Sequence, residues 1–173
     1  MAEYFITGVK GSGKSLSAVG RMVEYLNEGN RVATNLDLYL LDLLPKHCKD
    51  TNAVRVPDYP CLRDLQTIGI GNPTIQYEMT YNSETDSYEY ELFRSADFDE
   101  SKNGLLVFDE LATWMNARSY QDKKRQPVLD WLVHARKLGW DILYIVQDLE
   151  MVDKQARRGF AEHVVYCKRL DRV

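Results

Sequence analysis

Apolar and polar positions alternate along the first part of the chain in a way that predicts a strand, a helix and a second strand. The β-rich run from Glu3 to Thr7 ends at a glycine and is typical of a buried first strand. Apolar residues then recur at helical spacing between Leu16 and Leu26, and Gly29 follows as a stop signal. The segment 31–35 predicts the second strand. This order of elements indicates the start of a parallel α/β sheet.

The chain from residue 105 onward continues this pattern. Leu105 to Phe108 is a continuous apolar run, as expected for a parallel strand that is buried on both faces. Pro127 opens a helix with one apolar face, and Gly139 ends it. The remaining segments predict a strand at 141–146, a short helix at about 150–158 and a last strand at 163–168.

The middle of the chain is less regular. Prolines interrupt the segment 36–72, in which we expect only a short strand at 53–56 and a short helix at 62–68. Apolar and polar residues then alternate over 74–94 around a polar stretch, which predicts a β-hairpin. The segment 74–100 is strongly acidic, and we interpret it as an insertion in an otherwise compact domain that spans residues 1–173.

Composition and charge narrow the function classes. A net charge of −4 and a pI near 5.4 argue against a dedicated nucleic-acid coat protein. The basic stretch 118–137 leaves a local nucleic-acid or partner surface open, beside the simpler interpretation as a solvated helix face. No apolar run approaches the roughly 20 residues that span a bilayer, and the start lacks a signal-peptide pattern, so we expect a cytosolic segment. The cysteines, at positions 48, 61 and 167, predict neither disulfides nor a metal site.

The segment after the first strand matches the phosphate-loop, or Walker A, pattern Gly8-x-x-x-x-Gly13-Lys14-Ser15. Glycines permit the backbone torsions and the close approach that a phosphate cradle needs. Backbone N–H groups and the helix N-terminus attract the phosphates, Lys14 contacts the β- and γ-phosphates, and Ser15 helps to hold Mg²⁺. A simple glycine-rich turn is the alternative. The predicted strand before the segment and the predicted helix after it favour a phosphate loop that binds ATP. The predicted cradle is Gly8, Val9, Lys10, Gly11, Ser12, Gly13, Lys14 and Ser15.

Two acids follow the apolar run 105–108 and match the second half of such a site, the Walker B pattern. Asp109 is placed to bind Mg²⁺, and Glu110 to orient or deprotonate the attacking water. The alternative is an acidic pair at a helix start. Gln147, at the end of another predicted strand, is a candidate contact for the γ-phosphate or the water. Candidate arginine fingers from a neighbouring subunit are Arg118, Arg125, Arg136, Arg157 and Arg158.

These segments together resemble the filamentous-phage gene I assembly proteins, the zonula occludens toxin-like family. The resemblance is carried by the phosphate loop and by residues 102–110, 134–142, 146–149, 152–157 and 161–167. It covers nearly the whole chain, but the members that this chain most resembles are much shorter at the acidic hairpin, so the hairpin inherits no role. Residues 135–147 are also similar, more distantly, to ring-forming DNA pumps. That similarity implies a ring, with Gln147 as sensor. The preferred fingers are Arg136 and Arg157, which lie in helices before and after the sensor strand, in segments that match the phage family.

The resemblance implies an α/β fold of the P-loop NTPase class, with a RecA-like, mainly parallel sheet flanked by helices and an inserted hairpin. It also implies an ATPase with ATP and Mg²⁺ as cofactors, acting in virion assembly and export at the cytoplasmic face of the host inner membrane. Its partners would be its own copies, other phage assembly proteins and the host envelope. The chain stops at Val173, before the transmembrane helix of such proteins, and is expected to be the cytoplasmic motor domain. The alternatives are a small-molecule kinase and an ATP-binding scaffold without significant turnover. A GTPase is disfavoured, because the sequence contains no Asn-Lys-x-Asp run of the kind that binds guanine.

Overall fold

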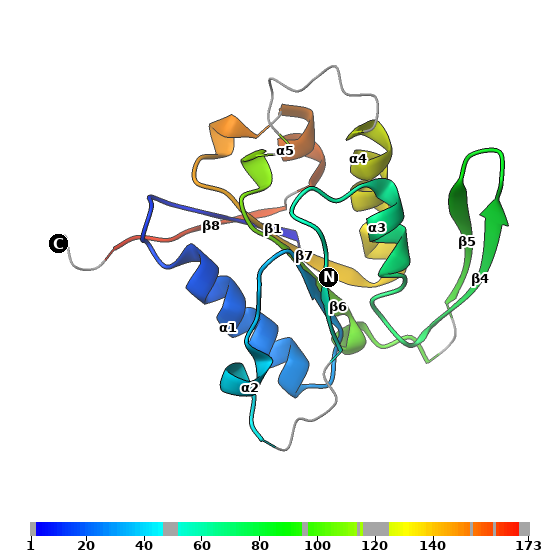
Figure 1. Cartoon of the computed structure of the whole chain (residues 1–173), viewed down its shortest axis with the longest axis horizontal. Coiled ribbons are helices and arrows are strands. Elements are labelled where there is room, and N and C mark those ends of the chain that lie inside the picture. The colour runs from blue at the N-terminus through cyan, green and yellow to red at the C-terminus, as the bar shows by residue number, and fades with distance from the viewer. Residues whose placement is uncertain are drawn as a thin grey trace.

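The protein is built around a six-stranded sheet in which each neighbouring pair of strands runs parallel. The computed structural model describes residues 3–46, 52–94, 97–113, 115, 125–152, 154–160 and 162–169 (Figure 1). The strand order is β3-β2-β6-β7-β1-β8. The strands are β1 (Glu3–Thr7), β2 (Val32–Thr34), β3 (Ala53–Arg55), β6 (Gly104–Phe108), β7 (Trp140–Ile145) and β8 (His163–Tyr166).

Helices cover both faces of the sheet, so most side chains of the central strands are apolar and buried. On one face α1 (Lys14–Asn27) and α2 (Leu40–Leu43) pack against alternate strand residues such as Val107 and Ile145. The other face is covered by α3 (Leu62–Thr67), α4 (Arg125–His134) and α5 (Lys154–Phe160). All five residues of β6 are buried, as expected for a parallel strand between two helical layers. The predicted α/β class with a mainly parallel sheet flanked by helices is confirmed.

The predicted elements are present, with shifted ends. The helix expected after Pro127 begins two residues earlier, at Arg125, and its last turn tightens into a 3₁₀ segment at Ala135–Leu138. Gly139 ends it with a φ of 77°, where a Cβ would lie 2.3 Å from the Cβ of Asn72. The sequence pattern did not predict α2. Nor did it predict the 3₁₀ turns at Glu100–Lys102, Leu111–Thr113 and Leu149–Met151.

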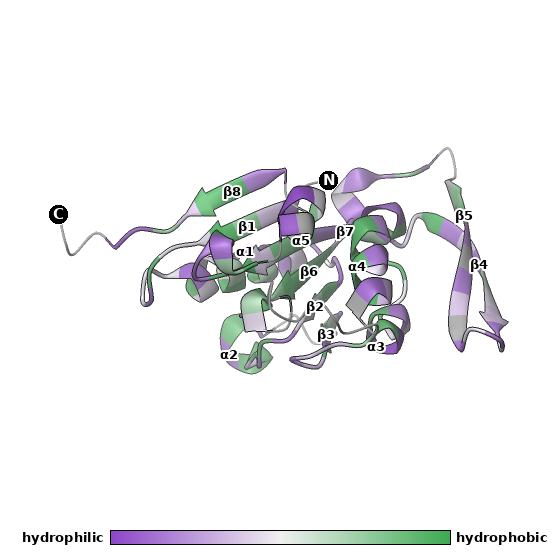
Figure 2. Ribbon diagram, turned by 90° about the horizontal axis from the view of Figure 1, so that it is seen from above, coloured by the Kyte–Doolittle hydropathy of each residue, from purple (hydrophilic) through white to green (hydrophobic). Residues whose placement is uncertain are grey.

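The hairpin of β4 (Ile75–Asn82) and β5 (Ser87–Arg94) forms a separate two-stranded sheet, where the alternation predicts it. Figure 1 and Figure 2 show it at one side of the domain, next to α3, and the Gln66 side chain of α3 donates to the Tyr88 carbonyl oxygen over 3.1 Å. At its base Ile75 is buried in the core. The side chain of Asn72 also ties the base together, donating to Asn103 Oδ1 over 2.7 Å and accepting from the N–H of Thr74 over 2.8 Å. The hairpin therefore contacts the domain both at its base and along α3.

No helix among the described residues has the length and apolar character needed to cross a bilayer.

A buried carboxyl group lies at the amino-terminal edge of the sheet. Glu3, the first residue of β1, is 5 % exposed. Burial raises the pKa of its carboxyl to about 7; Arg136 lowers that pKa, while Glu162 and Asp141 raise it further. The folded protein therefore keeps Glu3 protonated at pH values where the unfolded chain has released the proton. The stability that this proton provides is complete below about pH 4.5 and is lost as the pH rises through about 7.

We expect Glu3→Gln, which mimics the protonated acid, to be more stable than the wild type above pH 7 and nearly equal to it at pH 4.5. The advantage of Glu3→Gln over the wild type in free energy of unfolding should grow by about 2 to 3 kcal/mol from pH 4.5 to above pH 7. Denaturant titration at both pH values measures it. Glu28→Gln, at an exposed site after α1, controls for the loss of one negative charge. A stability gain from Glu3→Gln that does not depend on pH would contradict this account.

Candidate functional site

The loop between β1 and α1 has the backbone geometry of a phosphate cradle. Gly8, Gly11 and Gly13 have φ values of 147°, 75° and 88°, a region that side chains other than glycine rarely occupy. At Gly8 a Cβ would also lie 2.3 Å from the carbonyl oxygen of Cys167, which follows β8. The pattern of glycines is therefore required by torsion at three positions and by close packing at the first.

The start of α1 is open to an anion. Gly13 caps the helix without a side-chain hydrogen bond, and the first turn contains no acidic residue. The first N–H groups of a helix have no partner within the helix, and its dipole is positive at this end. The Lys14 ammonium lies over the same loop, donating to the carbonyl oxygens of Gly8 and Val9 over 2.7 and 3.2 Å. The loop thus combines a cation with unsatisfied backbone donors.

Asp109 lies beside this loop, because β6 and β1 run in the same direction on either side of β7. Both strands therefore end at the same edge of the sheet. The Ser15 hydroxyl donates a hydrogen bond to Asp109 Oδ2 over 3.2 Å. The two residues are separated by 94 positions in the sequence, so the sheet topology alone brings them together.

Glu110 and Gln147 form a second contact at this edge. The Gln147 side chain donates to Glu110 Oε1 over 3.0 Å, and its carbonyl oxygen accepts from the Thr7 hydroxyl over 3.2 Å. Glu110 is exposed and has a φ of 54°, which is unusual for a residue with a side chain. The strand ends of β1, β6 and β7 therefore bring the proposed base and the proposed sensor together, facing solvent.

The donor atoms at this edge suit a magnesium ion carried by a nucleotide. Ser15 and Asp109 supply a hydroxyl and a carboxylate oxygen, the hard ligands that Mg²⁺ prefers. Within the described part of the chain, no group of three His, Cys, Asp or Glu residues could hold a metal by itself. This fits an ion that keeps few protein ligands and takes others from phosphates and water.

Of the two preferred arginine candidates, Arg136 lies away from this edge within the same molecule. Arg136 precedes β7, so it lies at the amino-terminal edge, where it pairs with Glu162 over 2.5 Å. Arg157 is half-buried on α5, and its Nε has no hydrogen-bond partner among the described residues. Arg118 and the side chain of Arg125 lie outside the described residues. Arg136 thus lies at the edge of the sheet opposite its own phosphate loop.

Two residues at the site escape the sequence reasoning. Arg169 follows β8, and its Nη1 lies 3.8 Å from the position of a Cβ at Gly11, so a cation of the same chain borders the phosphate loop. The sequence signal for Arg169 was its position just after the last predicted strand, which ends at this edge of the sheet. The other residue is Asn35, whose side chain hydrogen-bonds to the backbone of Asp109. A side-chain amide that bonds to backbone leaves no periodic pattern in a sequence.

Comparison with known proteins places this arrangement in a family context. Residues 2–173 match the family model described as zonular occludens toxin (Zot). The chain is 50 % identical over 175 residues to the Gene 1 protein of Enterobacteria phage fd and 47 % identical over 175 residues to that of Salmonella phage IKe. Both alignments cover the whole chain but only 44 % and 42 % of the relatives. The chain therefore spans less than half the length of these curated relatives.

Solved structures share the fold. The N-terminal domain of zonular occludens toxin from Neisseria meningitidis aligns with a TM-score of 0.55 at 21 % identity, over 99 % of this chain and 79 % of that one. The genome packaging NTPase B204 from Sulfolobus turreted icosahedral virus 2, solved with AMPPCP, aligns with a TM-score of 0.55 at 12 % identity, over 98 % and 77 %. At these identities the likeness concerns the fold, which is that of a P-loop NTPase.

Proposed function

The chain belongs to the zonular occludens toxin family, and from this premise we propose that it is the ATP-hydrolysing motor domain of a membrane-anchored filamentous-phage assembly and extrusion protein. The observation that carries the proposal is the hydrogen bond between Ser15 and Asp109. It joins the two halves of a phosphate and metal site that the sequence predicts independently. The similarity to Gene 1 proteins of several phages supports the biological setting.

Each site residue has a distinct role in the proposed reaction. The loop N–H groups and Lys14 bind the phosphates, and Lys14 exchanges the carbonyl oxygens of Gly8 and Val9 for charged phosphate oxygens. Ser15 and Asp109 would hold Mg²⁺, which would supply positive charge against the developing charge on the phosphates. Glu110 accepts the proton of the attacking water, and Gln147 holds the Glu110 carboxylate in place. Water attacks the γ-phosphorus, the bond to the β-phosphate oxygen breaks, and ADP and phosphate leave.

We place the domain at the cytoplasmic face of the bacterial inner membrane. The relatives are more than twice as long as the stretch that this chain covers, which leaves room for an anchor and a further domain. In the full-length protein the partners would be other phage assembly proteins and the host envelope.

Replacement of the proposed base separates binding from hydrolysis. Glu110→Gln keeps the shape of the side chain and removes the carboxylate, so turnover of ATP should fall by roughly 100-fold or more with little change in the dissociation constant for ATP. Lys14→Ala is the contrasting variant, because it removes a cation that binds phosphate and should weaken binding itself. Phosphate release and fluorescent-nucleotide titration measure the two quantities. Normal turnover in Glu110→Gln would leave Glu110 as an acid that merely follows a strand.

We also propose that the motor works as a homo-oligomeric ring in which an arginine of one copy completes the site of the next. Arg136 and Arg157 are the candidates: Arg136 lies at the edge of the sheet opposite its own phosphate loop, and the Arg157 Nε has no hydrogen-bond partner among the described residues. The rate per subunit of the full-length protein should rise with protein concentration, and loss of the finger should cost roughly 10³ in turnover. Lys137→Ala and Lys154→Ala remove exposed cations close to the two candidates in the sequence and serve as controls. Full activity in both Arg136→Ala and Arg157→Ala, at a rate independent of concentration, would contradict the proposal.

A further inference from the structure

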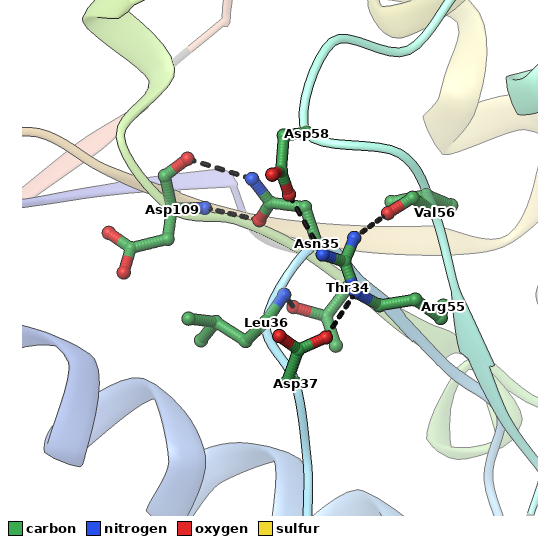
Figure 3. Close-up of polar contacts among 8 residues, drawn as sticks. All are labelled: Thr34, Asn35, Leu36, Asp37, Arg55, Val56, Asp58 and Asp109. Carbon is green, nitrogen blue, oxygen red and sulfur yellow. Dashed lines mark hydrogen bonds and ion pairs between the residues drawn. The ribbon is translucent and has the colours of Figure 1, made fainter.

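The side chain of Asn35 binds both backbone groups of Asp109. Its amide nitrogen donates to the Asp109 carbonyl oxygen over 2.9 Å, and its amide oxygen accepts from the Asp109 N–H over 2.7 Å (Figure 3). The ladder between β2 and β6 ends one step earlier, at the pair Thr34 and Val107. The Asn35 amide therefore continues the hydrogen-bond ladder beyond the end of the strands. Its side chain takes the place of the backbone groups of β2 as the partner of β6.

This contact holds the backbone at Asp109, where the acidic pair begins to turn away from the sheet. On the other side of β6, the pairing with β7 ends at Phe108, and Val146 bonds to Ile6 of β1 instead. Asp109 Oδ1 then accepts from the N–H of Glu110, which has a φ of 54°. The left-handed conformation is unfavourable for a residue with a side chain and persists where its surroundings determine it.

The segment that carries Asn35 is bonded to β3, the strand at the edge of the sheet, and to the residues after it. Thr34 is buried, accepts from the N–H of Leu36 over 3.1 Å and offers its carbonyl oxygen to the N–H of Val56 over 2.9 Å. Arg55, the last residue of β3, donates to Asp37 and Asp58 over 2.8 and 2.9 Å and so joins the segment after β2 to the segment after β3 (Figure 3). These exposed ion pairs contribute little energy singly, but together they limit where the segment that carries Asn35 can lie.

We infer that Asn35 is a positioning residue for ATP hydrolysis, which fixes the backbone of Asp109 and thereby the places of the Asp109 and Glu110 carboxylates. The inference rests on the proposed function. Asn35 acts through two hydrogen bonds on one peptide position, so a shift of the acidic pair by about 1 Å is the expected result of its loss. Displacement of that size costs up to about 100-fold in rate.

A purely structural role is the competing explanation, and the chain offers a matched control for it. Asn30 is 5 % exposed and donates over 2.9 Å to the carbonyl oxygen of Ser101, at the opposite end of β2 from the site. Asn30→Ala therefore removes a buried side-chain-to-backbone bond of the same kind without touching the acidic pair. It reports the cost of lost stability alone.

The test measures ATP turnover, nucleotide affinity without metal and Mg²⁺ dependence in the full-length protein. For Asn35→Ala we expect kcat to fall about 30- to 100-fold and the Mg²⁺ concentration for half-maximal rate to rise, with metal-free ATP affinity within about twofold of wild type. Asn35→Asp keeps the acceptor for the Asp109 N–H, loses the donor and adds a like charge, so it should show the same pattern. If Asn35→Ala does not fold, the kcat and the Mg²⁺ dependence of Asn35→Asp test the inference in its place. Asn30→Ala should keep kcat within about twofold.

A double variant locates the effect. If Asn35 acts through Glu110, then adding Asn35→Ala to Glu110→Gln should lower the residual rate by less than about threefold, far short of the product of the single effects. Normal kcat in both Asn35 variants, an equal loss in Asn30→Ala, or multiplicative effects in the double variant would overturn the inference alone. Wild-type protein without hydrolysis would overturn the proposed function and the inference together.

Discussion

The parallel direction of β1 and β6 is the constraint on which the site depends. Both strands lie in one buried sheet with β7 between them, so the chain after each strand emerges at the same edge. One of these segments is the phosphate loop and the other is the acidic pair. The hydrogen bond from Ser15 to Asp109 follows from this arrangement, and two helical layers of apolar side chains keep the strands in register.

Charge is distributed along the sheet in a way that separates its two edges. At the carboxyl-terminal edge, Lys14, the open start of α1 and the nearby Arg169 oppose the carboxylates of Asp109 and Glu110. At the amino-terminal edge, Glu3 is buried beside Arg136, Glu162 and Asp141. At the first edge Glu110 is exposed, whereas at the second the Glu3 carboxyl is buried and Arg136 pairs with Glu162. Arg136 therefore lies at the edge opposite the phosphate loop of its own chain.

The sequence predicts those parts of the fold whose signal is local. The apolar run 105–108, the glycines of the phosphate loop and the hairpin alternation each leave a pattern in consecutive residues, and each is found where predicted. The places of Ser15, Asp109, Glu110 and Gln147 follow from strand direction, although their chemical roles remain predictions. The role of Asn35 could not be predicted, because a side chain that bonds to a distant backbone depends on the register between β2 and β6. The bounds of the hairpin insertion were also beyond the sequence, since Ile75 alternates like its neighbours yet packs in the core.

The central claim is that this edge of the sheet activates water against ATP. Hydrolysis by the full-length protein in water enriched in ¹⁸O tests it most directly, with the isotope content of phosphate and ADP read by mass spectrometry. The account predicts one atom of ¹⁸O in each released phosphate and none in ADP, because water attacks the γ-phosphorus. Phosphate that appears only on a small-molecule acceptor, or the absence of any released phosphate under Mg²⁺ and ATP, would contradict it.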